Sequence, residues 1–161
     1  MKLQIYYELY ITFFIFIGIV FYVINYLFSY RSVYLKEIKK EILLQEAYRL
    51  SQFLTNDIGE PSNWYNNIAS IKRIGLLSSP SLFNHLSLSK ISSFNVLCQN
   101  NYTFVKQALG LEADFNILLT TNEGTILINC ERPLGEEVVE ISRIVSLDEN
   151  KTLGVLRIWV Y

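Results

Sequence analysis

The sequence predicts an α+β protein in which a long N-terminal helix, first membrane-spanning and then amphipathic, packs on a C-terminal four-stranded antiparallel sheet. Three observations predict this fold. Residues 9–30 carry no charge, residues 31–58 repeat apolar side chains at helical spacing, and residues 114–161 contain apolar runs separated by turn signals. Helix and sheet would each have an apolar face to bury, and packing one on the other buries both.

The stretch from Leu9 to Tyr30 is long enough to span a membrane, because a bilayer core requires roughly 20 apolar residues at 1.5 Å each. A cleaved secretory signal is the alternative. Such signals have a shorter apolar region followed by small residues at a cleavage site, whereas this run ends in NYLFSYRSVYLK, which offers no such site. We therefore expect a retained single-pass span in contact with membrane lipid.

Charge excludes some partners and leaves orientation open. The formal net charge is -1, so bulk charge gives no reason to expect a nucleic-acid partner. Only Lys2 precedes the span, whereas four basic residues follow it closely: Arg31, Lys36, Lys39 and Lys40. A positive-inside count would therefore place the C-terminal part in the cytoplasm.

Residues 31–58 continue the helical pattern on one face. No glycine or proline interrupts residues 31–58, Gly59 and Pro61 follow them, and TNDIGEP is typical of a helix end. The span and this amphipathic extension are therefore predicted to form one helix. The predicted apolar stripe consists of Leu35, Ile38, Ile42, Leu43, Ala47, Leu50, Phe53 and Leu54.

Beyond the helix, residues 59–113 are predicted to form loops and short helices, and residues 114–161 the sheet. The helical segments are LSLSKISSF and YTFVKQALGL, the second closed by Gly110. The predicted strands are 115–121, 125–131, 137–147 and 152–161, paired around the turns at 122–124 and 148–151. Trp159 is expected on or next to the core face of the last strand.

Several strings together resemble the ectodomains of archaeal pilin-like proteins. They are GEPSNW at 59–64, IGLLSS at 74–79, LSLSKI at 86–91, LGLEADFNI at 109–117 and the terminal RIWVY. Members of this family are membrane-anchored chains with a class III signal, a G-x-P-x-x-W turn and a last strand that contains tryptophan. The resemblance implies a structural turn at Gly59, Pro61 and Trp64. Because a ring of this size dominates local burial, we expect Trp64 to cover the helix–sheet core. The resemblance also implies an ectodomain outside the cell membrane, against the charge count.

The N-terminus also resembles that of type IV pilins, in which a short leader is cleaved and the mature chain begins with Gln and has Glu at its fifth position. LQIYYE matches from Gln4 to Glu8, within the leader segment 1–8. The resemblance implies that Glu8 meets the mature amine of another pilin-like subunit during assembly. Leu3 departs from the small residue that the processing peptidase favours before the cut, so an uncleaved anchor is the alternative.

Cysteines and glycosylation triplets are compatible with an extracellular location. Cys98 and Cys130 are the two cysteines, and an even number outside the cytosol permits a disulfide; two buried free thiols are the alternative. Asn101 and Asn150 each begin an N-x-Thr triplet that could accept a glycan.

Catalytic residue patterns are missing from the sequence. His85 is the single histidine, and no phosphate-binding glycine loop is present, so we expect no enzyme, metal or cofactor. Three function classes remain: a structural or adhesive component of a type IV pilus-like assembly, a monomeric membrane-anchored extracellular binding module, and a cytoplasmic enzyme or sensor subunit. The third class, a cytoplasmic enzyme or sensor subunit, is supported only by the basic residues after the span.

Overall fold

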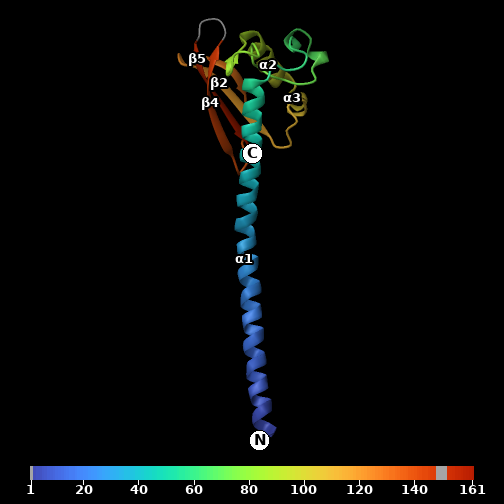
Figure 1. Ribbon diagram of the computed structural model, residues 1–161, viewed down its shortest axis with the longest axis vertical. Coiled ribbons are helices and arrows are strands. Elements are labelled where there is room, and N and C mark those ends of the chain that lie inside the picture. Colours follow the sequence, from blue (N-terminus) through green and yellow to red (C-terminus); the bar gives the residue numbers. More distant parts are fainter. Residues whose placement is uncertain (1, 148–151) are drawn as a thin grey trace. The chain divides into compact units, whose positions relative to one another are not determined.

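A computed structural model describes residues 2–147 and 152–161, with the backbone alone for residues 2–6 and for Ser32. The chain forms two compact units, residues 1–39 and residues 40–161. A single helix, α1 (Lys2–Asn56), provides all described residues of the first unit and the first 17 residues of the second (Figure 1). The uninterrupted helix predicted from the sequence is confirmed, and it ends two residues before the predicted boundary.

The second unit contains the remaining elements, shown in Figure 1. Two short 3-10 helices, η1 (Trp64–Asn66) and η2 (Ile68–Ser70), precede the strand β1 (His85–Leu86). The helices α2 (Leu88–Asn100) and α3 (Tyr102–Ala108) follow. The last strands are β2 (Phe115–Thr121), β3 (Ile126–Cys130), β4 (Val139–Leu147) and β5 (Leu153–Val160).

The sheet corrects one part of the sequence prediction. The four predicted strands form, and β2–β3, β2–β5 and β4–β5 pair antiparallel. The sheet nevertheless has five strands in the order β1-β4-β5-β2-β3, and β1 pairs parallel with β4, so it is mixed and not purely antiparallel. The predicted turn at 148–151 lies outside the described residues.

β1 was missed because two residues are too short to show a strand period. His85 and Leu86 pair with Ser146 and Leu147, and the Ser146 amide donates to the Asn84 carbonyl at 2.8 Å. Leu86 is fully buried, so burial of one side chain holds this short edge strand in place.

One face of the sheet forms the core together with the helices of the second unit. Alternate residues of β5, namely Leu156, Ile158 and Val160, point into it and are fully buried. The part of α1 in this unit contributes Leu43, Ala47, Leu50 and Leu54 to the same cluster. Burying a leucine side chain stabilises by roughly 2 to 3 kcal/mol, so this cluster is what holds the distal helix against the sheet.

Trp159 lies on the other face of β5, which corrects its expected position. Ile158 and Val160 on either side of it are fully buried, whereas Trp159 is half-buried. Its cross-strand neighbours are Asn116 and Glu140. The chain after β3 covers this outer face, because the Asn116 side chain donates to the Arg132 carbonyl and accepts from its amide, at 2.9 and 2.7 Å.

Candidate functional site

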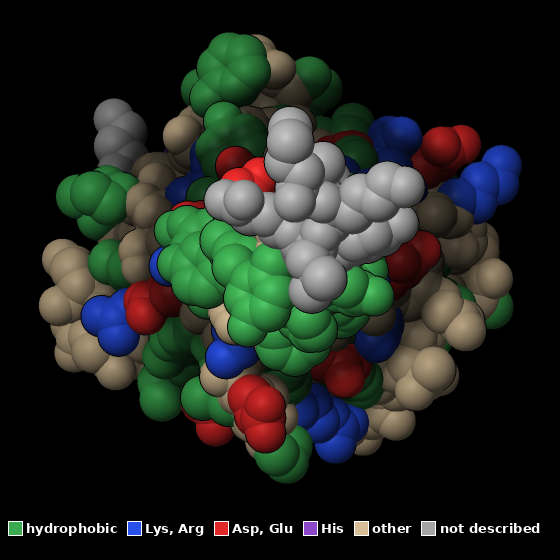
Figure 2. Space-filling view, turned by 90° about the horizontal axis from the view of Figure 1, so that it is seen from below, with side chains coloured by type: hydrophobic (Ala, Val, Ile, Leu, Met, Phe, Trp, Pro, Cys, Tyr) green, Lys and Arg blue, Asp and Glu red, His purple; other side chains and the backbone are tan. Residues whose placement is uncertain are grey.

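The first unit offers an apolar helical surface as its candidate site. Every residue from Tyr7 to Arg31 is exposed in this structure. Figure 2, which views the molecule from below, shows hydrophobic side chains gathered around the near end of α1. Single exposed apolar residues are ordinary, but a continuous apolar surface of this extent marks an interaction site. By length and composition this helix is able to cross a membrane.

Glu8 lies next to the start of the uncharged stretch. Its side chain is exposed, and its backbone carbonyl accepts a hydrogen bond from the Thr12 hydroxyl at 2.8 Å. Gln4 is helical, one turn before Glu8, but its side chain lies outside the described part of the chain. The structure therefore describes the Glu8 side chain. The contact of Glu8 with the amine of a mature chain that begins at Gln4 stays a prediction.

The turn at Gly59, Pro61 and Trp64 fastens the end of α1. Trp64 is fully buried, and its indole Nε1 donates to the Gly75 carbonyl at 3.0 Å. Gly59 has φ 78°, and a Cβ placed there would come within 2.6 Å of the Trp64 ring. The Glu60–Pro61 peptide is cis. Only glycine combines this backbone conformation with such close contact, so the turn and the tryptophan depend on each other.

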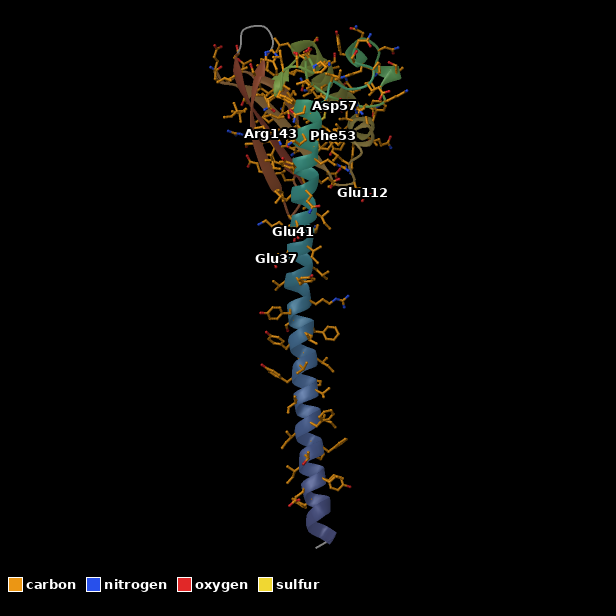
Figure 3. The ribbon with its side chains drawn as sticks, in the orientation of Figure 1. Glu37, Glu41, Phe53, Asp57, Glu112 and Arg143 are labelled. Atoms are coloured by element: carbon orange, nitrogen blue, oxygen red, sulfur yellow. A yellow bond between two sulfur atoms is a disulfide. The ribbon has the colours of Figure 1, made fainter. Side chains whose placement is uncertain are left out.

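Polar groups complete this helix-end anchor. The Leu76 amide donates to the Leu54 carbonyl in the last turn of α1, at 3.1 Å. The Arg73 guanidinium binds the Asp57 carboxylate, with Nε 2.6 Å from Oδ2. Figure 3 shows Asp57 just past the end of the helix. The hydrogen bond from Leu76 satisfies a carbonyl that a helix C-terminus would otherwise leave without a partner, and the ion pair ties Asp57 to the segment that contains Arg73.

Lys90 is an unexpected part of the anchor. It is 4% exposed, and its ammonium donates to the Ile58 and Leu77 carbonyls, each at 2.8 Å. A buried lysine is rare unless its charge is bound, and carbonyls beyond a helix C-terminus provide the negative potential that a cation requires. In the sequence, Lys90 looks like any polar residue of an amphipathic helix, so no signal distinguished it.

A polar contact links β4 to the distal part of α1. The Arg143 guanidinium Nε donates to the Ser51 hydroxyl at 2.8 Å and lies over the Tyr48 ring at 5.3 Å. Figure 3 shows Arg143 beside the helix. Ser51 is fully buried, so this hydrogen bond satisfies a polar group inside the helix–sheet contact.

A shallow groove of about 320 Å³ runs along the distal part of α1, near Glu112 in Figure 3. Its polar groups bind one another: Arg49 donates to the Gly110 carbonyl at 2.6 Å, and the Glu112 amide donates to the Glu46 carboxylate at 2.9 Å. These contacts tie the segment after α3 to the helix. They give the groove a structural role.

The remaining candidate residues lie in the second unit. Cys98 in α2 and Cys130 in β3 are joined in a disulfide across 32 residues of sequence, with Cα atoms 5.8 Å apart. Asn101 is exposed between α2 and α3, and its side-chain oxygen accepts from the Phe104 amide at 3.2 Å as the N-cap of α3. Asn150 lies outside the described residues.

The titratable cluster with clear pKa shifts joins α3 to β2. Burial raises the pKa of Tyr102 to about 12, and its hydroxyl accepts from the Phe115 amide at 2.9 Å. A hydrogen bond from Lys106, at 2.7 Å, lowers the pKa of Asp114 below its usual 3.8. A protonated tyrosine beside a paired carboxylate holds two elements together, and neither group is poised to exchange protons near neutral pH.

No group of three or more His, Cys, Asp or Glu side chains that could hold a metal ion occurs within residues 2–147 and 152–161. Comparisons with protein-family models, with curated proteins and with solved structures find no match to this chain.

Proposed function

We propose that this chain is a non-enzymatic, pilin-like surface protein, a minor or anchored component of a type IV pilus-like assembly with a structural or adhesive role. Its N-terminal helix lies in the cell membrane as a single span, and its second unit lies outside the cell. The observation that carries this proposal is Glu8, an exposed carboxylate directly before 22 uncharged residues, Leu9 to Tyr30.

The physical argument concerns the cost of this carboxylate. A charge at the edge of hydrocarbon is unfavourable, and such residues are usually functional and paired. The resemblance to pilins supplies the partner, the amine of a neighbouring mature chain that begins at Gln4. An ion pair between subunits would offset the cost of Glu8 and would also fix how far one helix is displaced along the next.

Two features of the second unit support an extracellular location. The Cys98–Cys130 disulfide is of the kind that persists in oxidising compartments and is rare in the cytosol. Asn101 is exposed, so the triplet that it begins is accessible to a glycosylating enzyme. Together they favour an extracellular second unit over the cytoplasmic location that the basic residues after the span predict.

Leu3 favours a second candidate function. If the branched side chain prevents cleavage, the chain keeps its first three residues and its amine stands too early to pair as in pilins. The protein would then be a monomeric, membrane-anchored extracellular binding module.

Substitution of Glu8 tests assembly. Glu8→Gln removes the charge and keeps the side-chain length, so we expect the protein to fold and insert while its recovery in sheared filament fractions falls about tenfold or more, because the amine of the neighbour loses its partner. Glu37→Gln is the matched control, since Glu37 is an exposed glutamate of the same helix beyond the uncharged stretch (Figure 3). It should leave recovery unchanged.

Substitution of Leu3 tests processing. Leu3→Gly should increase cleavage before Gln4, which mass spectrometry of the N-terminus reports. An uncleaved Leu3→Gly protein, together with wild-type recovery of Glu8→Gln, would contradict the pilin proposal and favour the anchored binding module.

A further inference from the structure

The uncharged part of α1 carries a polar seam. Gly18, Tyr22, Asn25 and Ser29 follow one another at intervals of four, three and four residues, and all four are exposed. At 3.6 residues per turn this spacing places them on one face of the helix. The rest of the span is predominantly aliphatic and aromatic, so the face defined by these residues differs from the others.

Asn25 is the residue of the seam that hydrocarbon tolerates least. It lies about 8 Å along the helix axis from the middle of the Leu9–Tyr30 stretch, at 1.5 Å per residue, and therefore inside a bilayer core of roughly 30 Å. Its Nδ2 donates to the Phe21 carbonyl at 2.8 Å, which is the single hydrogen bond of this side chain within the described part of the chain. One donor and the carbonyl oxygen of the amide remain available.

Thr12 shows how a polar residue in the same stretch is satisfied. Its hydroxyl donates to the Glu8 carbonyl at 2.8 Å, which uses its only hydrogen. It lies about 140° around the helix from Asn25, at 100° per residue. The two residues therefore differ in what they still require: Thr12 can face lipid, whereas the amide of Asn25 needs a hydrogen-bonding partner that neither lipid tails nor water can supply at that depth.

We propose that a second copy of this chain covers the polar seam, in parallel orientation, with Asn25 of one copy bound to Asn25 of the other. A carboxamide is both donor and acceptor and therefore complements itself. All copies insert with the same orientation, so symmetry brings the two amides to the same depth. This inference rests on the membrane span of the proposed function and is independent of assembly through Glu8.

Gly18 makes the close approach of two helices possible. It lies seven residues, two turns, before Asn25, and a Cβ placed on it meets no atom within 4 Å. Small residues at such positions let the backbones of membrane helices approach each other. The seven-residue repeat of the seam predicts a left-handed crossing, and a single buried asparagine in such a seam fixes the register of the pair.

The test uses the full-length chain in phosphatidylcholine vesicles, with donor- and acceptor-labelled copies mixed and energy transfer measured as lipid dilutes the protein. Asn25→Leu should weaken pairing about 3- to 30-fold, the range that interhelical hydrogen bonds in membranes cover. Asn25→Gln, which keeps the amide, should retain more of the pairing. Gly18→Leu should weaken pairing because its side chain separates the helices, although it meets nothing within the single chain.

Thr12→Val is the matched control, since it also removes a polar side chain from the span, and it should pair like the wild type. Absence of energy transfer in the wild type, or equal pairing by Asn25→Leu and the wild type, would overturn the inference. Extraction with alkaline carbonate separates this failure from failure of the proposed function. If the chain stays in the vesicles but does not pair, only the inferred dimer is contradicted. If the chain is extracted, both the proposed membrane span and the inferred dimer are contradicted.

Discussion

The two ends of α1 are both rich in apolar side chains, yet they differ in what can bury them. From Leu9 to Tyr30 the apolar residues surround the helix and every one is exposed. From Leu43 to Leu54 they are interspersed with polar residues, and one face is buried in the core of the second unit. Hydrophobicity on all sides is typical of a helix that is buried all round, in a membrane or in a larger apolar core, whereas an apolar stripe is typical of a helix that packs on a protein core by one face. Two parts of one helix thus have apolar patterns that suit different surroundings.

The sharpest way to test this difference is to add the same methyl group in both regions. A Cβ at Gly75 would come within 2.1 Å of the Asp57 carbonyl oxygen, a backbone atom that cannot rotate away. We expect Gly75→Ala to lower the free energy of unfolding by about 4 kcal/mol or more, because the helix-end anchor must shift. Denaturant titration in detergent, followed by the fluorescence of Trp64 and Trp159, measures it.

Gly18→Ala is its control, since a Cβ placed on Gly18 meets no atom of the chain within 4 Å and Gly18 lies outside the second unit, which contains both tryptophans. It should leave the unfolding curve unchanged. A wild-type curve for Gly75→Ala would mean that the close packing of the anchor is incorrectly described.

A second comparison removes the same side chain in both regions. Leu50 is 1% exposed and Leu27 is 61% exposed. Leu50→Ala should lower the free energy of unfolding by about 2 to 5 kcal/mol through lost burial and a cavity. Leu27→Ala should change it by less than about 0.5 kcal/mol in the same titration. Equal losses would show that both ends of α1 unfold with the second unit, and would remove the distinction between them.

Several elements could be predicted because they repeat a simple period. The helix and the four long strands follow periods of 3.6 and 2, and the end of the helix and the strand boundaries agree with the structure within two residues. The helix begins at Lys2, within the segment 1–8 that was predicted to precede it. The predicted stripe of α1 was too wide, because the structure buries Leu43, Ala47, Leu50 and Leu54 but leaves Ile42 57% and Phe53 37% exposed. Periodicity identifies an apolar side, but the shape of the partner decides how much of that side is covered.

Other features depend on contacts between distant residues. Lys90 is buried because carbonyls from residues 58 and 77 meet at its ammonium, and nothing near Lys90 in the sequence indicates this. RIWVY contains apolar residues on both faces of a strand, so the facing of Trp159 could not be read from alternation. Of the candidate site, the uncharged stretch and Glu8 follow from the sequence directly. The polar seam became apparent once the hydrogen bonds of Thr12 and Asn25 could be compared.

The smallest expected effect concerns the ion pair of Lys106 and Asp114 in the second unit, for which the uncharged stretch from Leu9 to Tyr30 has no counterpart. The hydrogen bond from Lys106 lowers the pKa of Asp114 in the folded chain below its usual value of 3.8. A lowered pKa means that the pair stabilises the folded chain above about pH 4 and that this contribution is lost as the pH falls through the folded pKa. The Asp114 side chain is 51% exposed, so solvent screening limits the contribution to well under about 1 kcal/mol.

A double-mutant cycle of Asp114→Asn and Lys106→Met, measured by denaturant titration at pH 7 and pH 2.5, should show a small favourable coupling at pH 7 and a weaker one at pH 2.5. Coupling that stays equal at both values would mean that the two residues interact through packing and that their charges contribute nothing.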